Sequence, residues 1–175
     1  MGSNTVSDET RFDEILSLLA KHGVQSILIG GLAGIAHGAG RATLDVDVVY
    51  ARDADNLLRL VEALAPHQPY LRGAPPGLPF RWDVRTLQSG LNFTLMTDLG
   101  DLDILGEVVG GGRYEELLPH TEETVLFGVV CRVVTLECLI QLKRAAGRPK
   151  DFEALAELQL LLEERRKLES GQEPA

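Results

Sequence analysis

Two spacings of apolar residues along the first third of the chain predict alternating helices and strands. Residues 8–22 repeat their apolar side chains every three to four positions, as an amphipathic helix does. Residues 24–29 form a short apolar run rich in β-branched side chains, which is typical of a buried strand. A helix is expected at 32–37, and the alternating pattern of 43–50 predicts a second strand.

The rest of the chain continues the alternation, with one long exception. Residues 65–90 hold five prolines and several glycines, so they are predicted to be irregular, and loops of this length are usually functional or mobile. The other expected elements are a helix from Asp53 to about Leu64, strands at 91–97 and 101–105 joined at Asp98–Gly100, a short helix at 113–118, a hairpin at 125–134 that turns at Gly128, and helices from Thr135 to Ala146 and from Arg148 to about Leu168.

This order of elements predicts an α/β (α+β) fold, in which a mixed β-sheet is flanked by helices. A chain of 175 residues fits one domain, which we place at 8–168. Its last part, residues 135–168, is expected to be a C-terminal helical pair. Residues 1–7 are predicted to be a flexible N-terminus, and 169–175 a polar tail.

Composition narrows the possible functions. The chain carries 26 Asp and Glu against 17 Lys and Arg, a net charge of −9, which disfavours a broad basic surface for duplex DNA. Cys131 and Cys138 do not fall into zinc-ligand spacing with the histidines and are interpreted as reduced, buried small side chains. No apolar stretch is long enough for a membrane span, and no signal peptide is visible, so we expect a cytoplasmic protein with no membrane partner.

The strongest chemical signal is a pair of carboxylates, Asp45 and Asp47, in the predicted strand 43–50. Alternate side chains of a strand share a face, so both carboxylates point the same way. Two like charges held this close are costly away from water unless a cation neutralises them, and Mg²⁺ prefers such oxygen ligands. The alternative is a solvated edge strand, which the two residues alone do not exclude.

Gly30 and Gly31 stand upstream of this pair, between the predicted strand 24–29 and the next helix. Glycines there let the backbone approach a ligand closely, and the start of a helix favours an anion such as phosphate. A phosphate-binding loop beside a carboxylate pair indicates a nucleoside triphosphate. The glycines do not form the Gly-x-Gly-x-x-Gly pattern of dinucleotide-binding enzymes, which makes that class a weaker alternative.

Together these motifs resemble the nucleotidyltransferase superfamily related to DNA polymerase beta, in which a Gly-Gly or Gly-Ser loop and a helix precede Asp-x-Asp. Within it the chain looks most like the stand-alone bacterial AbiEii/AbiGii-type enzymes, through Lys143 and the segment 146–151. The resemblance implies a third carboxylate on a later strand. Both Asp101 and Asp103 lie on one face of strand 101–105, and Asp103, which is flanked by apolar residues, is the better candidate.

The implied activity is metal-dependent transfer of a nucleoside monophosphate from a nucleoside triphosphate to an acceptor hydroxyl. Mg²⁺ or Mn²⁺ is the expected cofactor. The acceptor is left open among tRNA, another RNA, a protein and a small molecule, as are the nucleotide and the oligomeric state. A toxin–antitoxin role is one expectation. The expected catalytic and metal-binding residues are Asp45, Asp47 and Asp103, and the expected nucleotide-binding residues are Gly30, Gly31, Arg41, Thr43, Lys143, Arg148 and Lys150.

Several of these assignments have plain structural alternatives. The cations near Lys143 and Arg148 also fit ordinary charge placement at a helix–helix junction. Arg41 and Thr43 could reach a phosphate or simply close the turn before the strand. In the irregular segment, Arg72, Arg81, Trp82 and Arg85 could meet a base or an acceptor, or Trp82 could pack as an anchor of the core. A non-catalytic nucleotide- or RNA-binding regulator of the same fold is the alternative function.

Overall fold

A computed structural model describes residues 9–40 and 42–171. The predicted N-terminal segment 1–7, Arg41 and residues 172–175 of the predicted tail lie outside the described residues. Within the described ranges, no helix is both long enough and apolar enough to cross a membrane.

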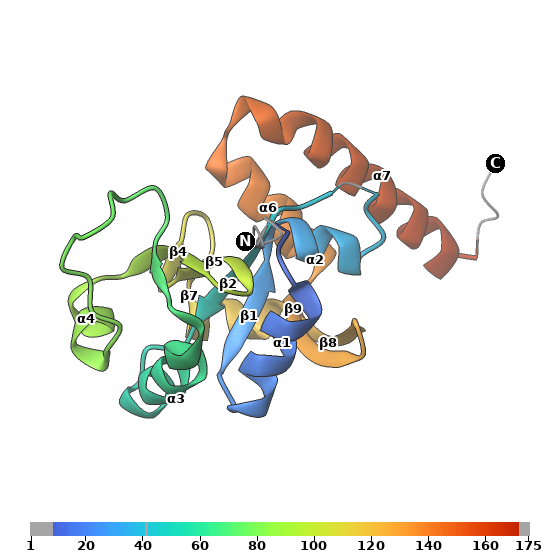
Figure 1. Ribbon diagram of the computed structural model, residues 1–175. Coiled ribbons are helices and arrows are strands. Elements are labelled where there is room, and N and C mark those ends of the chain that lie inside the picture. The colour runs from blue at the N-terminus through green and yellow to red at the C-terminus, as the bar shows by residue number, and fades with distance from the viewer. Residues whose placement is uncertain (1–8, 41, 172–175) are drawn as a thin grey trace, which may run out of the picture.

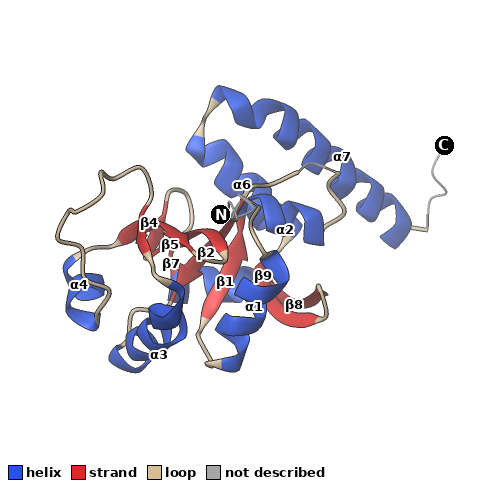
Figure 2. Ribbon diagram, viewed as in Figure 1, coloured by secondary structure: helices blue, strands red, loops and turns tan. Residues whose placement is uncertain are grey.

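A seven-stranded mixed sheet forms the centre of the molecule, in the order β3-β4-β5-β2-β1-β9-β8 (Figure 2). β2 runs parallel to β5 and antiparallel to β1, and β1 runs parallel to β9. A separate two-stranded sheet pairs β6 with β7. The strands are β1 Ser26–Ile29, β2 Asp45–Tyr50, β3 Tyr70–Leu71, β4 Asn92–Thr97, β5 Gly100–Leu105, β6 Glu107–Val108, β7 Gly112–Arg113, β8 Thr121–Leu126 and β9 Val129–Val134.

Helices flank this sheet, and the predicted α/β class is confirmed. In Figure 1, α6 and α7 form a pair on one side, while α3 and α4 lie at the other end of the molecule. The helices are α1 Phe12–Lys21, α2 Gly30–Ala36, α3 Ala54–Leu64, α4 Val84–Ser89, α5 Tyr114–Leu117, α6 Leu136–Ala146 and α7 Phe152–Glu169, with 3₁₀ turns at Ala65–His67, Leu118–His120 and Pro149–Asp151.

Capping side chains start the helices α3 and α6 at the predicted residues. The Asp53 carboxylate accepts a hydrogen bond from the backbone N–H of Asn56 and starts α3. The Thr135 hydroxyl accepts one from the N–H of Cys138 and starts α6. Gly147, with φ +62°, ends α6 in the left-handed conformation that glycine adopts without strain.

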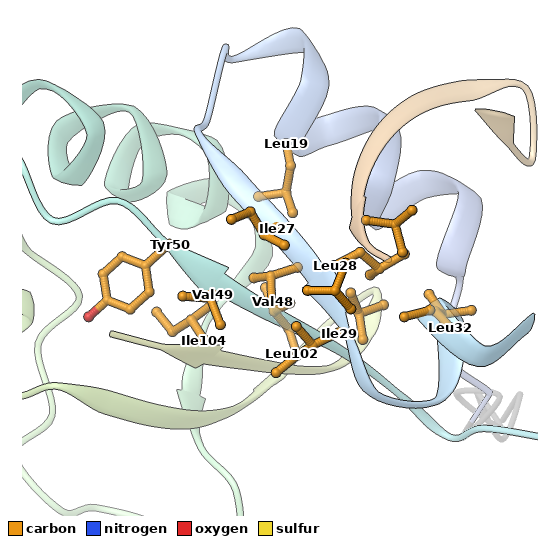
Figure 3. Close-up of a cluster of buried hydrophobic side chains, with 14 of the residues drawn as sticks. Leu19, Ile27, Leu28, Ile29, Leu32, Val48, Val49, Tyr50, Leu102 and Ile104 are labelled. Atoms are coloured by element: carbon orange, nitrogen blue, oxygen red, sulfur yellow. The ribbon is translucent and has the colours of Figure 1, made fainter. Parts of the chain in front are cut away.

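The core lies on both faces of the central strands (Figure 3). Ile27, Leu28 and Ile29 are all buried, which explains why β1 reads as a continuous apolar run instead of an alternating one. Leu16 and Leu19 of α1 line a cavity with Leu28, so α1 covers that face of β1. The opposite face carries Ile29 and Asp47, and α6 approaches it.

Four local predictions need correction. Gly30 and Gly31 form the first turn of α2 and not a separate loop, because β1 passes directly into that helix. The helix predicted over 8–22 spans only Phe12–Lys21 of the described residues. The hairpin strand begins at Thr121 and not at 125, since the polar sequence of an outer strand gives little hydrophobic signal. The irregular segment contains β3 and α4, which are too short to show periodicity.

Other predictions in this part of the chain hold. The strands β4 and β5 are joined at Asp98–Leu99, as expected. Trp82 is partly buried against the core, and its indole N–H donates to the carbonyl of Val61 at 3.0 Å. Of the two alternatives for Trp82, the structure thus shows packing as an anchor of the core. Both cysteines are free thiols, Cys138 buried and Cys131 half-buried.

Candidate functional site: a carboxylate cluster facing a cationic wall

The parallel pairing of β2 and β5 places four aspartates on one face of the sheet. Asp45 lies opposite Asp101, and Asp47 opposite Asp103. Because side chains alternate along each strand, Val46 and Leu102 point to the other face, where they are fully buried. The sheet register therefore brings together residues that are more than fifty positions apart in sequence.

Three of the four aspartates can act together on one ion. Asp45, Asp47 and Asp103 each offer a carboxylate oxygen, and these oxygens all lie within 4.8 Å of one another. Asp101 is not part of this group, and its side chain is 39% exposed against 21% for Asp103. Among the described residues, the cluster thus contains the three carboxylates that the sequence motifs single out.

Crowding in the cluster makes ionisation of Asp47 costly. Burial, followed by the charges of Asp45 and Asp103, raises the pKa of Asp47 to about 7. Burial also raises the pKa of Asp103, although the nearby Arg72 guanidinium opposes this shift. Near neutral pH the cluster therefore favours either a proton on Asp47 or a bound cation.

Arg72, at the end of β3, is the cation nearest to the cluster in the described structure. Its Nη2 lies 2.7 Å from Asp103 Oδ1, its Nε 3.3 Å from Asp101 Oδ2 and its Nη1 3.8 Å from Asp45 Oδ2. The sequence indicates Arg72 only as one of several residues that could meet a base or an acceptor. Its position depends on the neighbouring order β3-β4-β5, which leaves no motif in the sequence.

Two glycines at the start of α2 leave room for this arrangement. Gly30 has φ +68°, and a Cβ atom there would overlap the Asp47 carboxylate. A Cβ atom on Gly31 would lie 2.6 Å from the Thr43 hydroxyl oxygen. Thr43 donates a hydrogen bond to the carbonyl of Asp45 at 3.2 Å, so in this structure it closes the turn before β2. The predicted role of Arg41 concerns a residue outside the described structure.

The carboxylates form one side of a pocket of about 320 Å³, and cations form the other. Lys143 comes from α6, while Arg148 and Lys150 come from the connection to α7. Gly30 also lines this pocket, together with apolar side chains of Leu139 and Leu142. The predicted nucleotide-binding cations Lys143, Arg148 and Lys150 therefore line the same pocket as the aspartates.

Asp151 pairs with two of these cations. Its side chain is 11% exposed and lies 2.8 Å from Arg148 Nε and 3.8 Å from Lys143 Nζ. A buried carboxylate is tolerated when it is paired in this way. Arg81 and Arg85, by contrast, line a separate hollow with Pro79 and are not brought to the carboxylate pocket.

The donor set fits a hard divalent cation. Carboxylate oxygens are the ligands that Mg²⁺ and Mn²⁺ prefer, and a site with few protein ligands suits an ion that also binds substrate phosphates. Burial, and after it the charges of Asp45 and Asp103, raise the pKa of Asp47, and a bound cation would offset this cost of ionisation. The residues present are consistent with the metal site that the motifs predict.

Comparisons with known proteins show a related fold and the family of this chain. The crystal structure of the lincosamide antibiotic adenylyltransferase LnuA, solved with lincomycin bound, matches 87% of this chain and 99% of its own, with a TM-score of 0.58 and 16% sequence identity. The chain belongs to the family described as "Nucleotidyl transferase of unknown function (DUF2204)", whose model matches residues 8–171. No curated protein sequence is significantly similar to it. The superfamily assignment from the motifs is thereby confirmed.

Proposed function

We propose that the protein transfers a nucleoside monophosphate from a nucleoside triphosphate to an acceptor hydroxyl, with a divalent cation. The observation that carries the proposal is the cluster of Asp45, Asp47 and Asp103 beside a pocket whose far wall is cationic. Carboxylates suit the metal, and cations suit the triphosphate. Either feature alone is common, but the combination is what phosphoryl chemistry requires.

The residues have distinct proposed roles. Asp45, Asp47 and Asp103 would hold Mg²⁺ or Mn²⁺, which would supply charge stabilisation at the α-phosphate and orient it for in-line attack. Lys143, held by Asp151, and the exposed Arg148 and Lys150 would bind the phosphates and neutralise pyrophosphate as it leaves. Gly30 and Gly31 would allow the phosphates to approach the start of α2.

Two of the nucleotide-binding assignments are weaker than the others. In this structure Thr43 is engaged by the backbone of β2, so a phosphate contact would need its hydroxyl to rotate. The contribution of Arg41 stays a prediction. The closer resemblance to AbiEii/AbiGii-type enzymes and the toxin–antitoxin role also stay predictions.

The acceptor is proposed only as a hydroxyl-bearing molecule. LnuA, whose chain is matched over 99% of its length, is an adenylyltransferase of lincosamide antibiotics, so small hydroxylated antibiotics belong in the panel of acceptors beside RNA and protein. The chain has a net charge of −9, so it should repel a long duplex more than a small acceptor that contacts only the pocket.

Parallel incubations with α-labelled and γ-labelled nucleoside triphosphates test the proposal directly. The purified protein, Mg²⁺ and each of total RNA, lysate protein and a panel of small hydroxylated molecules are combined, and labelled products are separated. We expect label from the α-phosphate, and none from the γ-phosphate, to enter an acceptor. Transfer of the γ label would indicate a kinase instead.

A matched pair of variants identifies the site responsible. Asp45→Asn removes one carboxylate of the cluster, whereas Asp55→Asn removes one at an exposed position in the first turn of α3. Only the first change should abolish labelling. Mg²⁺-dependent nucleotide binding with no transfer to any acceptor would favour the non-catalytic regulator instead.

A further inference from the structure

The guanidinium of Arg72 occupies the position from which a cation would neutralise the carboxylate cluster. It contacts three aspartates at 2.7, 3.3 and 3.8 Å, two of which are proposed metal ligands. Its Nη2 also donates to the carbonyl of Leu95 at 2.7 Å. Its Nε is buried and makes no hydrogen bond among the described residues, so this part of the guanidinium is held by the charge of Asp101 alone.

While the Arg72 guanidinium lies beside these carboxylates, electrostatic repulsion opposes the binding of a divalent cation to them. A guanidinium is permanently charged, so it cannot lose its proton to admit a second cation. Asp103 Oδ1 accepts a hydrogen bond from Arg72 at 2.7 Å, so the carboxylate of one proposed metal ligand is already paired with a cation. Two cations sharing the same oxygens repel each other strongly in a partly buried site.

We propose that Arg72 is an internal counter-cation that competes with the divalent ion for Asp45 and Asp103 and is displaced when the ion binds. The inference rests on the proposed metal site and adds a control on its affinity. Without nucleotide, the ion must break the Arg72 ion pairs, so it binds weakly. The empty enzyme is thereby kept stable without its metal.

The backbone keeps the displaced guanidinium beside the site. The N–H of Arg72 donates to the carbonyl of Thr94 at 2.9 Å, and β3 pairs with β4 through Tyr70 and Leu71. Only the side chain therefore has to swing. A bound nucleoside triphosphate would offer the Arg72 side chain a new anionic partner, because guanidinium groups bind phosphate well. Metal and nucleotide should consequently bind cooperatively, with Arg72 as the coupling residue.

Calorimetric titration of Mn²⁺ into the nucleotide-free protein tests the competition. Arg72→Gln should bind Mn²⁺ about tenfold more tightly than the wild type, the size expected when one charge-assisted ion pair need not be broken. The gain in Mn²⁺ affinity caused by a non-hydrolysable nucleotide should shrink in this variant. Arg81→Gln is the matched control, because it removes an equal charge from the same segment away from the cluster.

Each outcome bears on the inference. If Arg72→Gln binds Mn²⁺ no tighter than the wild type, or if Arg81→Gln tightens binding equally, the competition is refuted while the metal site stands. If no protein binds Mn²⁺, the metal site itself fails and the inference with it. Should Arg72→Gln not fold, Arg72→Lys serves instead. Its ammonium cannot bridge three carboxylates, so it should tighten Mn²⁺ binding by a smaller factor.

Discussion

Replacing Asp47 with Asn should stabilise the metal-free protein while abolishing transfer. The carboxylate is forced to ionise next to Asp45 and Asp103, and the neutral amide has nearly the same shape. In an ordinary folded domain the loss of a buried polar partner destabilises, so a gain in stability is a distinctive sign of a site strained for function.

The size of the gain follows from the pKa of Asp47, which is raised from 3.8 to about 7. At about 1.4 kcal/mol for each pKa unit, ionising Asp47 alone in the folded state would cost at most about 4 kcal/mol. This pKa already includes the opposing charge of Arg72. The amide of Asn is itself a polar group that must be buried, so we expect Asp47→Asn to gain only about 1–2 kcal/mol, or about 3–6 °C in Tm for a chain of this size.

The sign of the pH dependence is fixed. The unfolded state ionises Asp47 near its ordinary pKa, whereas the folded state holds the proton until about pH 7. The cost of ionisation is therefore absent below pH 3.8, grows as the pH rises and reaches its full size above pH 7. Wild type should lose stability over this window relative to the variant.

Urea unfolding in EDTA at pH 5 and pH 8 measures this difference. The advantage of Asp47→Asn over the wild type should be larger at pH 8, and Asp55→Asn should stay within about 0.5 kcal/mol of the wild type at both. With Mn²⁺ in place of EDTA the order should reverse, because the ion stabilises the wild type and Asp55→Asn but not Asp47→Asn. A pH-independent difference, or an Asp47→Asn protein less stable at pH 8, would refute the reasoning.

Three further predictions concern neighbouring residues. Asp103→Asn should lower the transfer rate by orders of magnitude and Asp101→Asn only mildly, and the reverse ranking in the same assay would make Asp101 the third ligand. Gly30→Ala should destabilise more than Gly23→Ala in thermal melts, because both have positive φ but only the first Cβ meets a carboxylate. Asp151→Asn should raise KM for the nucleotide several-fold with little change in kcat, and a change confined to kcat would contradict its role in holding the phosphate-binding cations.

Local signals made most of the fold predictable. Asp53 and Thr135 carry their capping chemistry in their own side chains, and the turn at Asp98–Gly100 joins two strands that pair directly. The elements that were missed or shortened are those whose stability comes from tertiary packing. A two-residue strand such as β3 and the polar strand β8 have too few apolar positions to be recognised by periodicity.

The candidate site divides in the same way. The shared face of Asp45 and Asp47 could be predicted from the sequence, because alternate side chains of a strand point the same way. Asp103 could be expected only through the family resemblance, because the parallel register of β2 and β5 that brings it beside Asp47 leaves no local motif in the sequence. Arg72 was harder still, since its place results from two successive strand pairings, β3 with β4 and β4 with β5.

The distribution of charge is compatible with the proposed binding of a polyanion by an acidic chain. The net charge is −9, yet Lys143, Arg148 and Lys150 line one pocket, and Arg72 pairs with Asp103, which lines it too. Charges farther away than about 8 Å are largely screened at physiological ionic strength, so a bound triphosphate responds to this pocket and not to the total. A long duplex extends beyond the pocket and meets the acidic surface, whereas a nucleotide does not. Under the proposed function, this arrangement would suit a nucleoside triphosphate once a divalent ion offsets the three carboxylates, and the weak binding of duplex DNA stays a prediction.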